Sequence, residues 1–396
     1  MRLPILTAIY LILINIVVDY YILRVIKKRV RSKIVGRIYL YLSILLPLSV
    51  VVVISLPRRS GSDLSLLFIM WALYTYLTIN FPKYLFVIFD IISYIPRLWK
   101  AKRISIISKM GIGVSIALFL LMWWGALFNR FSVDINEVSI EIADLPKNFE
   151  GYKIIQISDL HVGAYRGDTT YIAKVVNEIN KLNADAIVFT GDIVNRNTTE
   201  LIPFVEILSK IKSKDGVYSV LGNHDYGDYS DWKTPEDKLN DQLMMQRLHK
   251  NMGWQLLLNE TKYVYRKGDS IAIIGVENVG DPPFKVYGSL SNAYPLIGDS
   301  VVKILLTHNP IHWEQEIKDD EEKNIALTLS GHTHAMQIYL LGYSPSSMRY
   351  KYWAGLYSDE SKKRKLYVNI GIGTVALPMR IGATPEITLI TLTRSK

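Results

Sequence analysis

The chain of 396 residues contains no cysteine. Disulfide bonds and thiolate metal ligands are therefore excluded, although this absence says little about the cellular compartment. Histidine is also scarce, with 7 residues in the whole chain.

Acidic residues are nearly absent from the first third of the chain. Residues 1–130 hold 17 of the 46 Lys and Arg but only 3 of the 36 Asp and Glu, which leaves 29 basic and 33 acidic residues for the remainder. The formal net charge of +10 therefore belongs to the first third, and the remainder is slightly acidic. A basic surface for nucleic acid is not supported, so we expect no nucleic-acid partner.

Long apolar runs fill this same first third. About 20 apolar residues in a helix cross the roughly 30 Å of hydrocarbon in a bilayer. Runs of that length are residues 3–25, 38–56 and 110–128. The first run could also be a signal peptide, but it lacks a strongly basic start and a small-residue cleavage site, so we expect a retained anchor.

A fourth apolar tract covers residues 64–95 and is too long for one straight span. It is interrupted at Asn80, Pro82 and Lys83, so we expect a span over 64–82 followed by a shorter kinked or interfacial piece. A second crossing within this tract stays open. The sequence thus predicts an all-α bundle of about four transmembrane helices in a lipid bilayer.

The loops of this bundle differ in charge. Seven Lys and Arg lie within 24–37 and five within 97–109. The basic residues expected on the other side are Arg2, Arg58, Arg59 and Arg130. By the positive-inside rule the two basic loops are cytoplasmic. We therefore expect a multi-pass cell-membrane protein whose chain after Phe128 is extracytoplasmic.

From residue 131 short Val/Ile-rich strands alternate with amphipathic helices, which indicates α/β units. After a transmembrane anchor over 1–130, we expect a linker and first strand over 131–149 and a domain over 150–396. Helices are predicted over 168–182 and about 198–212. Polar residues follow five of the predicted strands directly, where ligand sites of α/β sheets collect.

Those polar residues stand in "SDLHVG", "TGDIVN", "LGNHD", "THNP" and "SGHTH". In this order the five stretches resemble the signatures of the calcineurin-like metallophosphoesterase superfamily, over residues 150–392. The tail "YVNIGIGTVALPMRIGATPEI" resembles the bacterial membrane-anchored branch. The resemblance implies an α/β fold, a four-layer αββα sandwich, that holds two divalent metal ions. It also implies hydrolysis of a phosphomonoester or phosphodiester by attack of a metal-bound hydroxide.

Carried over residue by residue, the resemblance implies two sets of metal ligands. The first set is Asp159, His161 and His334, the second is Asn223, His308 and His332, and Asp192 bridges the two. Neutral imidazoles mixed with carboxylates suit Mn, Fe or Zn better than Mg or Ca. His332 and His334, from one strand end, would serve different ions.

The resemblance also implies catalytic roles for His224 and Asp225. His224 would face the leaving-group oxygen as general acid or charge donor, and Asp225 would define its loop. Where the family often has a second acid after Gly-Asp, this chain has Asn195, whose amide would orient His224 without stabilising its charged form. Slower activity or a lower pH optimum would follow. Arg380 in "LPMR" would bind the substrate phosphate or form a structural salt bridge.

Other residues carry weaker signals. Asp19 and Asp90 stand in apolar tracts without an identifiable partner, so each marks a functional site or reaches an interface. His249 and His312 are expected to be surface or packing residues on helices. The aromatic segment 338–357 would cap the metal cleft, touch the bilayer or pack on its own domain.

The sequence therefore favours a membrane-anchored phosphohydrolase acting outside the cytoplasm on a phosphorylated small molecule or a lipid-linked phosphate. The alternative is a non-catalytic receptor for a phosphate ligand, or an accessory subunit of a membrane transport system. Complete ligand sets and the retained His224 favour the enzyme.

Overall fold

The computed structural model describes residues 5–30, 32–57, 59–60, 63–280, 282, 284–294, 301–320, 322–361 and 363–395. The first residues of the predicted span 3–25, and Arg2, Arg31 and Arg58 of the charge prediction, lie outside the described residues. The chain divides into two compact units. One consists mostly of Met1–Leu127, and the other of Phe128–Val375 and Arg380–Lys396.

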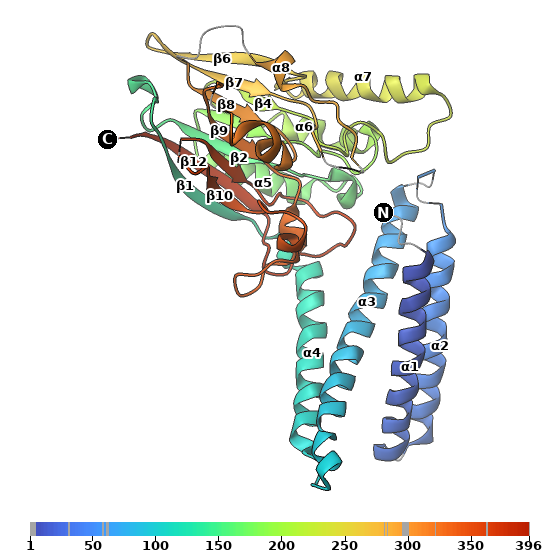
Figure 1. The fold of residues 1–396 in the computed structure, drawn as a ribbon. Coiled ribbons are helices and arrows are strands. Elements are labelled where there is room, and N and C mark those ends of the chain that lie inside the picture. The colour runs from blue at the N-terminus through green and yellow to red at the C-terminus, as the bar shows by residue number, and fades with distance from the viewer. Residues whose placement is uncertain are drawn as a thin grey trace. The chain divides into compact units, whose positions relative to one another are not determined.

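The first unit is helical (Figure 1). Its long helices are α1 (Ile5–Arg29), α2 (Lys33–Ser55), α3 (Asp63–Ile92) and α4 (Ser105–Leu127), with a short 3-10 helix at Ile95–Trp99 before α4. Within the described residues, three helical stretches are long and apolar enough to cross a membrane, namely Lys33–Ser55, Leu64–Trp99 and Ser105–Phe131. The predicted helical anchor is present, and a crossing by α1 stays a prediction.

Helix α3 does not end near residue 82, where a span was expected to stop. It continues through Pro82 to Ile92. The polar residues of this stretch are paired inside the unit, because the Asn80 side chain donates to the Tyr76 carbonyl at 2.8 Å and Lys83 Nζ lies 2.9 Å from Asp19 Oδ1. Polar groups satisfied in this way can stay within an apolar helix.

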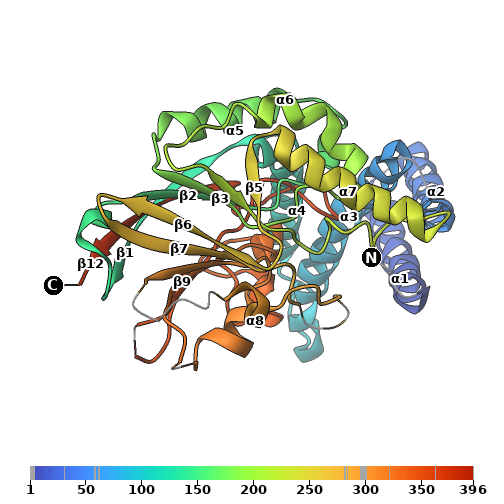
Figure 2. The ribbon, with the colours of Figure 1, turned by 90° about the horizontal axis from the view of Figure 1, so that it is seen from above.

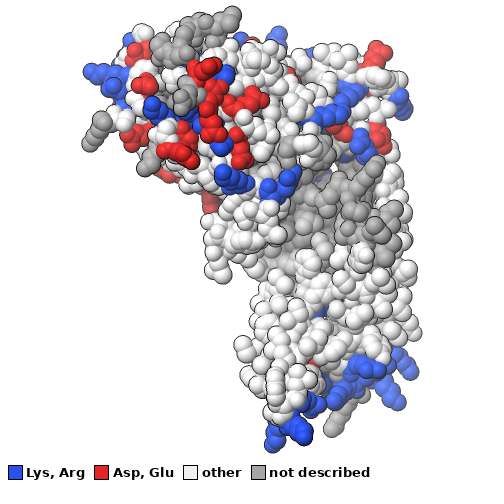
Figure 3. Space-filling view, in the orientation of Figure 1, with Lys and Arg blue, Asp and Glu red and all other residues white. Residues whose placement is uncertain are grey.

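Asp90 joins both basic loops at one end of the helical unit. Its Oδ1 atom lies 2.8 Å from Nη2 of Arg29 and 2.6 Å from Nη2 of Arg103, and Tyr21 donates to its Oδ2 at 2.7 Å. Lys and Arg gather at the end of the helices, whereas most of the visible atoms along their flank are neither basic nor acidic (Figure 3). Asp90 therefore has a structural role, as does Asp19 through its ion pair with Lys83.

The second unit contains two packed β-sheets. The first has the order β1 (Asp134–Ile142), β12 (Glu386–Arg394), β2 (Lys153–Ile157), β3 (Ala186–Phe189), β4 (Val217–Ser219), β5 (Trp254–Leu256). The second has the order β10 (Gly355–Ser358), β11 (Lys365–Val368), β9 (Ile325–Ser330), β8 (Lys303–Leu306), β7 (Asp269–Gly275), β6 (Glu260–Arg266). Neighbours β2, β3 and β4 run parallel, as do β8 and β9.

Alternate residues of the strands separate the layers of this unit. Ile154 faces the core between the sheets, whereas Ile155 packs beneath α5 (Thr170–Lys181). The first sheet is also covered by α6 (Val205–Leu208) and α7 (Pro235–Asn251), and the second by α8 (Leu290–Ala293) with the turn Trp313–Ile317 (Figure 2). The predicted four-layer αββα sandwich is confirmed.

One predicted helix takes a different form. The expected helix over about 198–212 is a 3-10 helix at Thr198–Phe204 that runs into the single turn of α6. Pro203 stands in this stretch and has no N–H for an α-helical hydrogen bond. The N–H of Thr198, the first residue of this 3-10 helix, donates to Oδ1 of Asp241 in α7 at 2.9 Å.

Candidate metal centre

Five strand ends deliver the predicted ligands to one end of the sandwich. Asp159 and His161 follow β2, Asp192 follows β3, Asn223 follows β4, His308 follows β8, and His332 and His334 follow β9. Parallel neighbours end at the same edge of a sheet, which explains why residues far apart in sequence meet there.

The backbone at these ends is held in an unfavourable conformation. Asp159, His161, Asp192, His332 and His334 all have φ between +44° and +74°. Residues other than glycine pay about 1–2 kcal/mol for a left-handed conformation and keep it only where the surrounding structure imposes it. Such clusters of strain are typical of functional sites.

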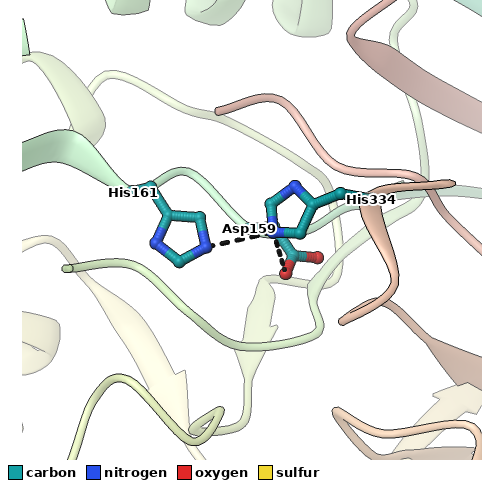
Figure 4. A group of neighbouring side chains, drawn as sticks. All are labelled: Asp159, His161 and His334. Atoms are coloured by element: carbon teal, nitrogen blue, oxygen red, sulfur yellow. Dashed lines mark hydrogen bonds and ion pairs between the residues drawn. The ribbon is translucent and has the colours of Figure 1, made fainter. Parts of the chain in front are cut away.

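The first ligand cluster is Asp159, His161 and His334 (Figure 4). One candidate ligand atom from each residue lies within 4.8 Å of the others. The Nε2 atoms of His161 and His334 are 3.1 Å apart, and His334 Nε2 is 3.1 Å from Asp159 Oδ1. The other oxygen of Asp159 accepts from the His332 N–H at 3.0 Å, which directs Oδ1 into the cluster.

The second cluster is Asp192, His308 and His332, again within 4.8 Å. His308 Nε2 lies 3.1 Å from both Asp192 Oδ2 and His332 Nδ1. Asp192 Oδ2 is also 3.7 Å from Nε2 of His161 in the first cluster. One carboxylate oxygen therefore faces both clusters, as a bridging ligand requires.

The hydrogen bonds of the imidazole rings fit metal binding. The outer nitrogen of His161 donates to the Val194 carbonyl, that of His308 donates to the Thr190 carbonyl at 2.8 Å, and that of His332 contacts the Tyr350 hydroxyl at 3.1 Å. A proton on each outer nitrogen leaves a lone pair on the inner one. His161, His308 and His332 therefore fit divalent cations, whereas the outer nitrogen of His334 faces the Arg380 guanidinium at 3.2 Å.

The negative charge of Asp192 in the second cluster also favours binding of a cation. Burial opposes a charge on His308, but the Asp192 carboxylate overcomes it and raises the pKa of His308 to about 9. Burial, with the charge of His308, lowers the pKa of His332 to about 3. His308 and Asp192 would hold a divalent cation once His308 has lost this proton.

Arg380 lies behind His334 and is completely buried. Its guanidinium donates to the carbonyl oxygens of Gly373, Ile370 and Ala383, at 2.8, 2.9 and 3.0 Å respectively. Its Nη2 atom also lies 3.2 Å from His334 Nδ1. These contacts favour a role in positioning His334 over direct contact with a substrate phosphate.

The amide oxygen of Asn223 remains a candidate ligand. Its Nδ2 donates to the Tyr229 hydroxyl at 2.9 Å, which fixes the orientation of the amide. Its Oδ1 atom is buried and has no hydrogen-bond partner among the described residues. A buried acceptor without a donor is costly, and a cation at this position would satisfy it.

His224 is partly exposed. Its Nδ1 donates to the main-chain oxygen of Asn195 at 2.6 Å, and its ring stacks on Tyr229 with centroids 4.3 Å apart. Burial lowers the pKa of His224. Asn195 was expected to orient His224 through its amide, but it does so through its backbone. The residue type at position 195 therefore does not by itself imply a changed pH optimum.

Asp225 is buried beneath this loop. Its carboxylate accepts hydrogen bonds from the N–H groups of Asp192, Ile193, Val194 and Gly222, between 2.8 and 3.2 Å. Burial and the charge of Asp192 raise the pKa of Asp225 to about 7, and the N–H donors oppose that rise. Asp225 therefore ties the ends of β3 and β4 together, in the loop-defining role expected for it.

Two tyrosines at the centre were not identified from the sequence as site residues. Tyr229 orients Asn223, and Tyr350 contacts His332. Tyr350 falls in the aromatic segment 338–357, which was the available signal, and Tyr229 is five residues after His224. His249 and His312 lie outside both clusters and are buried packing residues.

Comparisons with known proteins agree with this geometry. Residues 152–336 match the family described as "Calcineurin-like phosphoesterase", and residues 1–130 match "Probable Calcineurin-like phosphoesterase, transmembrane domain". The chain is 32% identical over 273 residues to "Uncharacterized metallophosphoesterase YkuE" of Bacillus subtilis (strain 168), covering 66% of this chain and 85% of that protein.

Two vertebrate proteins are also similar. The "Transmembrane protein with metallophosphoesterase domain" of Danio rerio is 30% identical over 264 residues, and that of Bos taurus is 29% identical over 263 residues. Each match covers 65% of this chain and 56% of the relative, so the chain spans little more than half of their length. With the bacterial relative matched over most of its length, the similarity shows that this chain belongs to the calcineurin-like metallophosphoesterases.

Proposed function

We propose that this chain is a membrane-anchored phosphohydrolase that cleaves a phosphomonoester or phosphodiester, lipid-linked esters included, on the extracytoplasmic side. The observation that supports the proposal is the position of Asp192 Oδ2, which lies 3.1 Å from His308 in its own cluster and 3.7 Å from His161 in the other.

Two divalent ions about 3.5–4 Å apart would supply an activated water and compensate charge on the phosphoryl group. Asp159, His161 and His334 would hold one ion, and Asn223, His308 and His332 the other, with Asp192 shared. His224 keeps one ring nitrogen on the Asn195 carbonyl, so its Nε2 is the atom that holds or transfers a proton at the leaving-group oxygen.

The proposed extracytoplasmic position of the second unit is inferred from the charge of the loops. The ion pairs of Asp90 with Arg29 and Arg103 support the expectation that both basic loops share one side. The positive-inside rule makes that side cytoplasmic. The chain after α4 would then be outside, because α4 crosses once from that side, whether or not α1 also crosses. Alkaline phosphatase fused after Lys396 should then be active, and a fluorescent protein that matures only in the cytoplasm should stay dark. The reverse pattern would overturn the orientation.

The reaction is tested with the full chain reconstituted in nanodiscs. Nucleotides, sugar phosphates and lipid phosphates are offered in turn with Mn, Fe or Zn, and the His224→Ala variant serves as the control. Metal-dependent turnover that falls in the variant supports the enzyme. Saturable binding of a phosphate ester without turnover in any metal would instead support the non-catalytic receptor.

A further inference from the structure

An unusual turn stands in the aromatic segment of the second unit. Leu340 and Tyr343 exchange two backbone hydrogen bonds of 2.9 Å, and the residues between them, Leu341 and Gly342, have φ of +52° and +83°. Tight turns with two left-handed central residues ordinarily use Asn, Asp or Gly there. A leucine at this position is strained.

Leu341 is also completely exposed, with a relative accessibility of 106%. The left-handed conformation of a leucine costs free energy, and burial among the described residues does not offset that cost. Other large apolar side chains exposed around it are Tyr339, Leu340, Tyr343 and Met348. We call residues 339–343 with Met348 the apolar turn. Contiguous exposed apolar groups of this kind mark an interaction surface.

The base of the apolar turn lies next to the start of the domain. Tyr339 N–H donates to the Ile381 carbonyl at 2.8 Å. The neighbouring carbonyl, that of Arg380, accepts from the Asn129 side chain at 3.0 Å. Asn129 is two residues beyond the end of α4 at Leu127. Contacts inside the second unit therefore place the apolar turn close to the point where the chain leaves its last membrane helix.

The segment that carries the apolar turn also reaches the metal centre. Tyr350 contacts His332 at 3.1 Å, and Thr333 donates to the Trp353 carbonyl at 2.6 Å. Residues 338–357 thus connect the apolar turn to the second ligand cluster.

We propose that the apolar turn inserts into the interfacial region of the lipid bilayer. Lipid is the occupant that the position favours, because the turn is continuous with the membrane end of the domain, and apolar side chains on a surface loop bind that region. This contact would hold the metal centre at the level of lipid head groups. The proposal goes beyond the reaction proposed above, and its test does not measure hydrolysis.

The absence of cysteine makes a direct test possible, because one introduced cysteine is a unique labelling site. Leu341→Cys and Met348→Cys carry a fluorophore in the full chain in nanodiscs. Tyr265→Cys is the matched control, since Tyr265 is 74% exposed and lies on β6, outside the segment. All three side chains are exposed, so the substitutions remove little packing. Spin-labelled lipid and aqueous iodide are the two quenchers.

Labels at 341 and 348 should be quenched several-fold more by spin-labelled lipid than the label at 265, and several-fold less by iodide. Leu341→Asn, which suits the turn, should reduce the lipid quenching at 348 without lowering Tm. Equal iodide quenching at all three positions would overturn the proposal. Protection of 341 from both quenchers would also overturn it, because a second copy or another protein would then cover the turn.

Discussion

The Nη2 atom of Arg380 lies 3.2 Å from Nδ1 of His334, while Nε2 of the same ring faces Asp159 at 3.1 Å. The buried guanidinium also binds three main-chain carbonyls between residues 370 and 383. A segment near the C-terminus thereby sets the orientation of a ligand from β9. Residues that orient metal ligands in this way affect metal affinity.

Replacing Arg380 by lysine should weaken one metal site. Lysine keeps the charge but cannot reproduce the planar fork that contacts several acceptors at once. We expect the dissociation constant of one ion to rise by about 10- to 100-fold, the usual effect of losing such a partner. Titration with a metal indicator measures it, and KM at saturating metal should stay unchanged. A raised KM with both ions retained would instead make Arg380 a substrate-binding residue.

Removing the imidazole at position 224 should slow turnover while both ions stay bound. A positioned proton donor contributes about 10²- to 10⁴-fold in rate, so His224→Ala should lose that much. The loss should be smaller for nitrophenyl esters than for alkyl esters, because an acidic leaving group needs less protonation. An equal loss for both ester types would mean that His224 acts on phosphoryl charge instead.

Tyr229→Phe should weaken binding of the ion that Asn223 would help to hold. The variant keeps the ring that stacks on His224 but loses the hydroxyl that fixes the Asn223 amide. Metal affinity should fall by about 10-fold or more, as for other partners of metal ligands. Tyr265→Phe, which removes an exposed hydroxyl far from both clusters in sequence, is the control. Unchanged affinity in the Tyr229 variant would show that Asn223 needs no such support.

Stability should depend on pH through His249. This ring is buried against Trp254, and burial lowers its pKa to about 4. The unfolded chain, with an ordinary pKa of about 6.5, binds a proton that the folded domain excludes, so stability is lost as pH falls from about 6.5 to 4. The loss is about 3 kcal/mol. Tm of the His249→Leu variant should change less over this range than that of the wild type. An identical pH profile would exclude His249 as the cause.

The two candidate ligand clusters could be predicted because their residues follow directly on short apolar strands. Asp159, Asp192 and His308 each stand two or three residues beyond a strand end, and five such ends in order form a pattern that sequence alone displays. The layered fold followed from the same alternation of strands and helices.

Long-range pairing could not be predicted. Arg380 contacts His334, which is 46 residues away in sequence, and Asp90 pairs with Arg29, which is 61 residues away. Neither partner is apparent from the sequence spacing. Lys83 of α3 likewise pairs with Asp19 in another helix, 64 residues away in sequence. The side-chain amide of Asn195 was a misleading signal, since its backbone makes the contact.

Replacing Asp192, whose carboxylate faces both clusters, tests the proposed dinuclear centre most directly. Asp192→Asn keeps the shape of the side chain but removes the charge that faces both clusters. Metal content measured by mass spectrometry and turnover of a chromogenic phosphodiester are compared with those of Asp144→Asn, which alters an exposed carboxylate. We predict about two ions per chain and full turnover for Asp144→Asn, with fewer ions and no turnover for Asp192→Asn. Two ions and full turnover in the Asp192 variant would contradict the account.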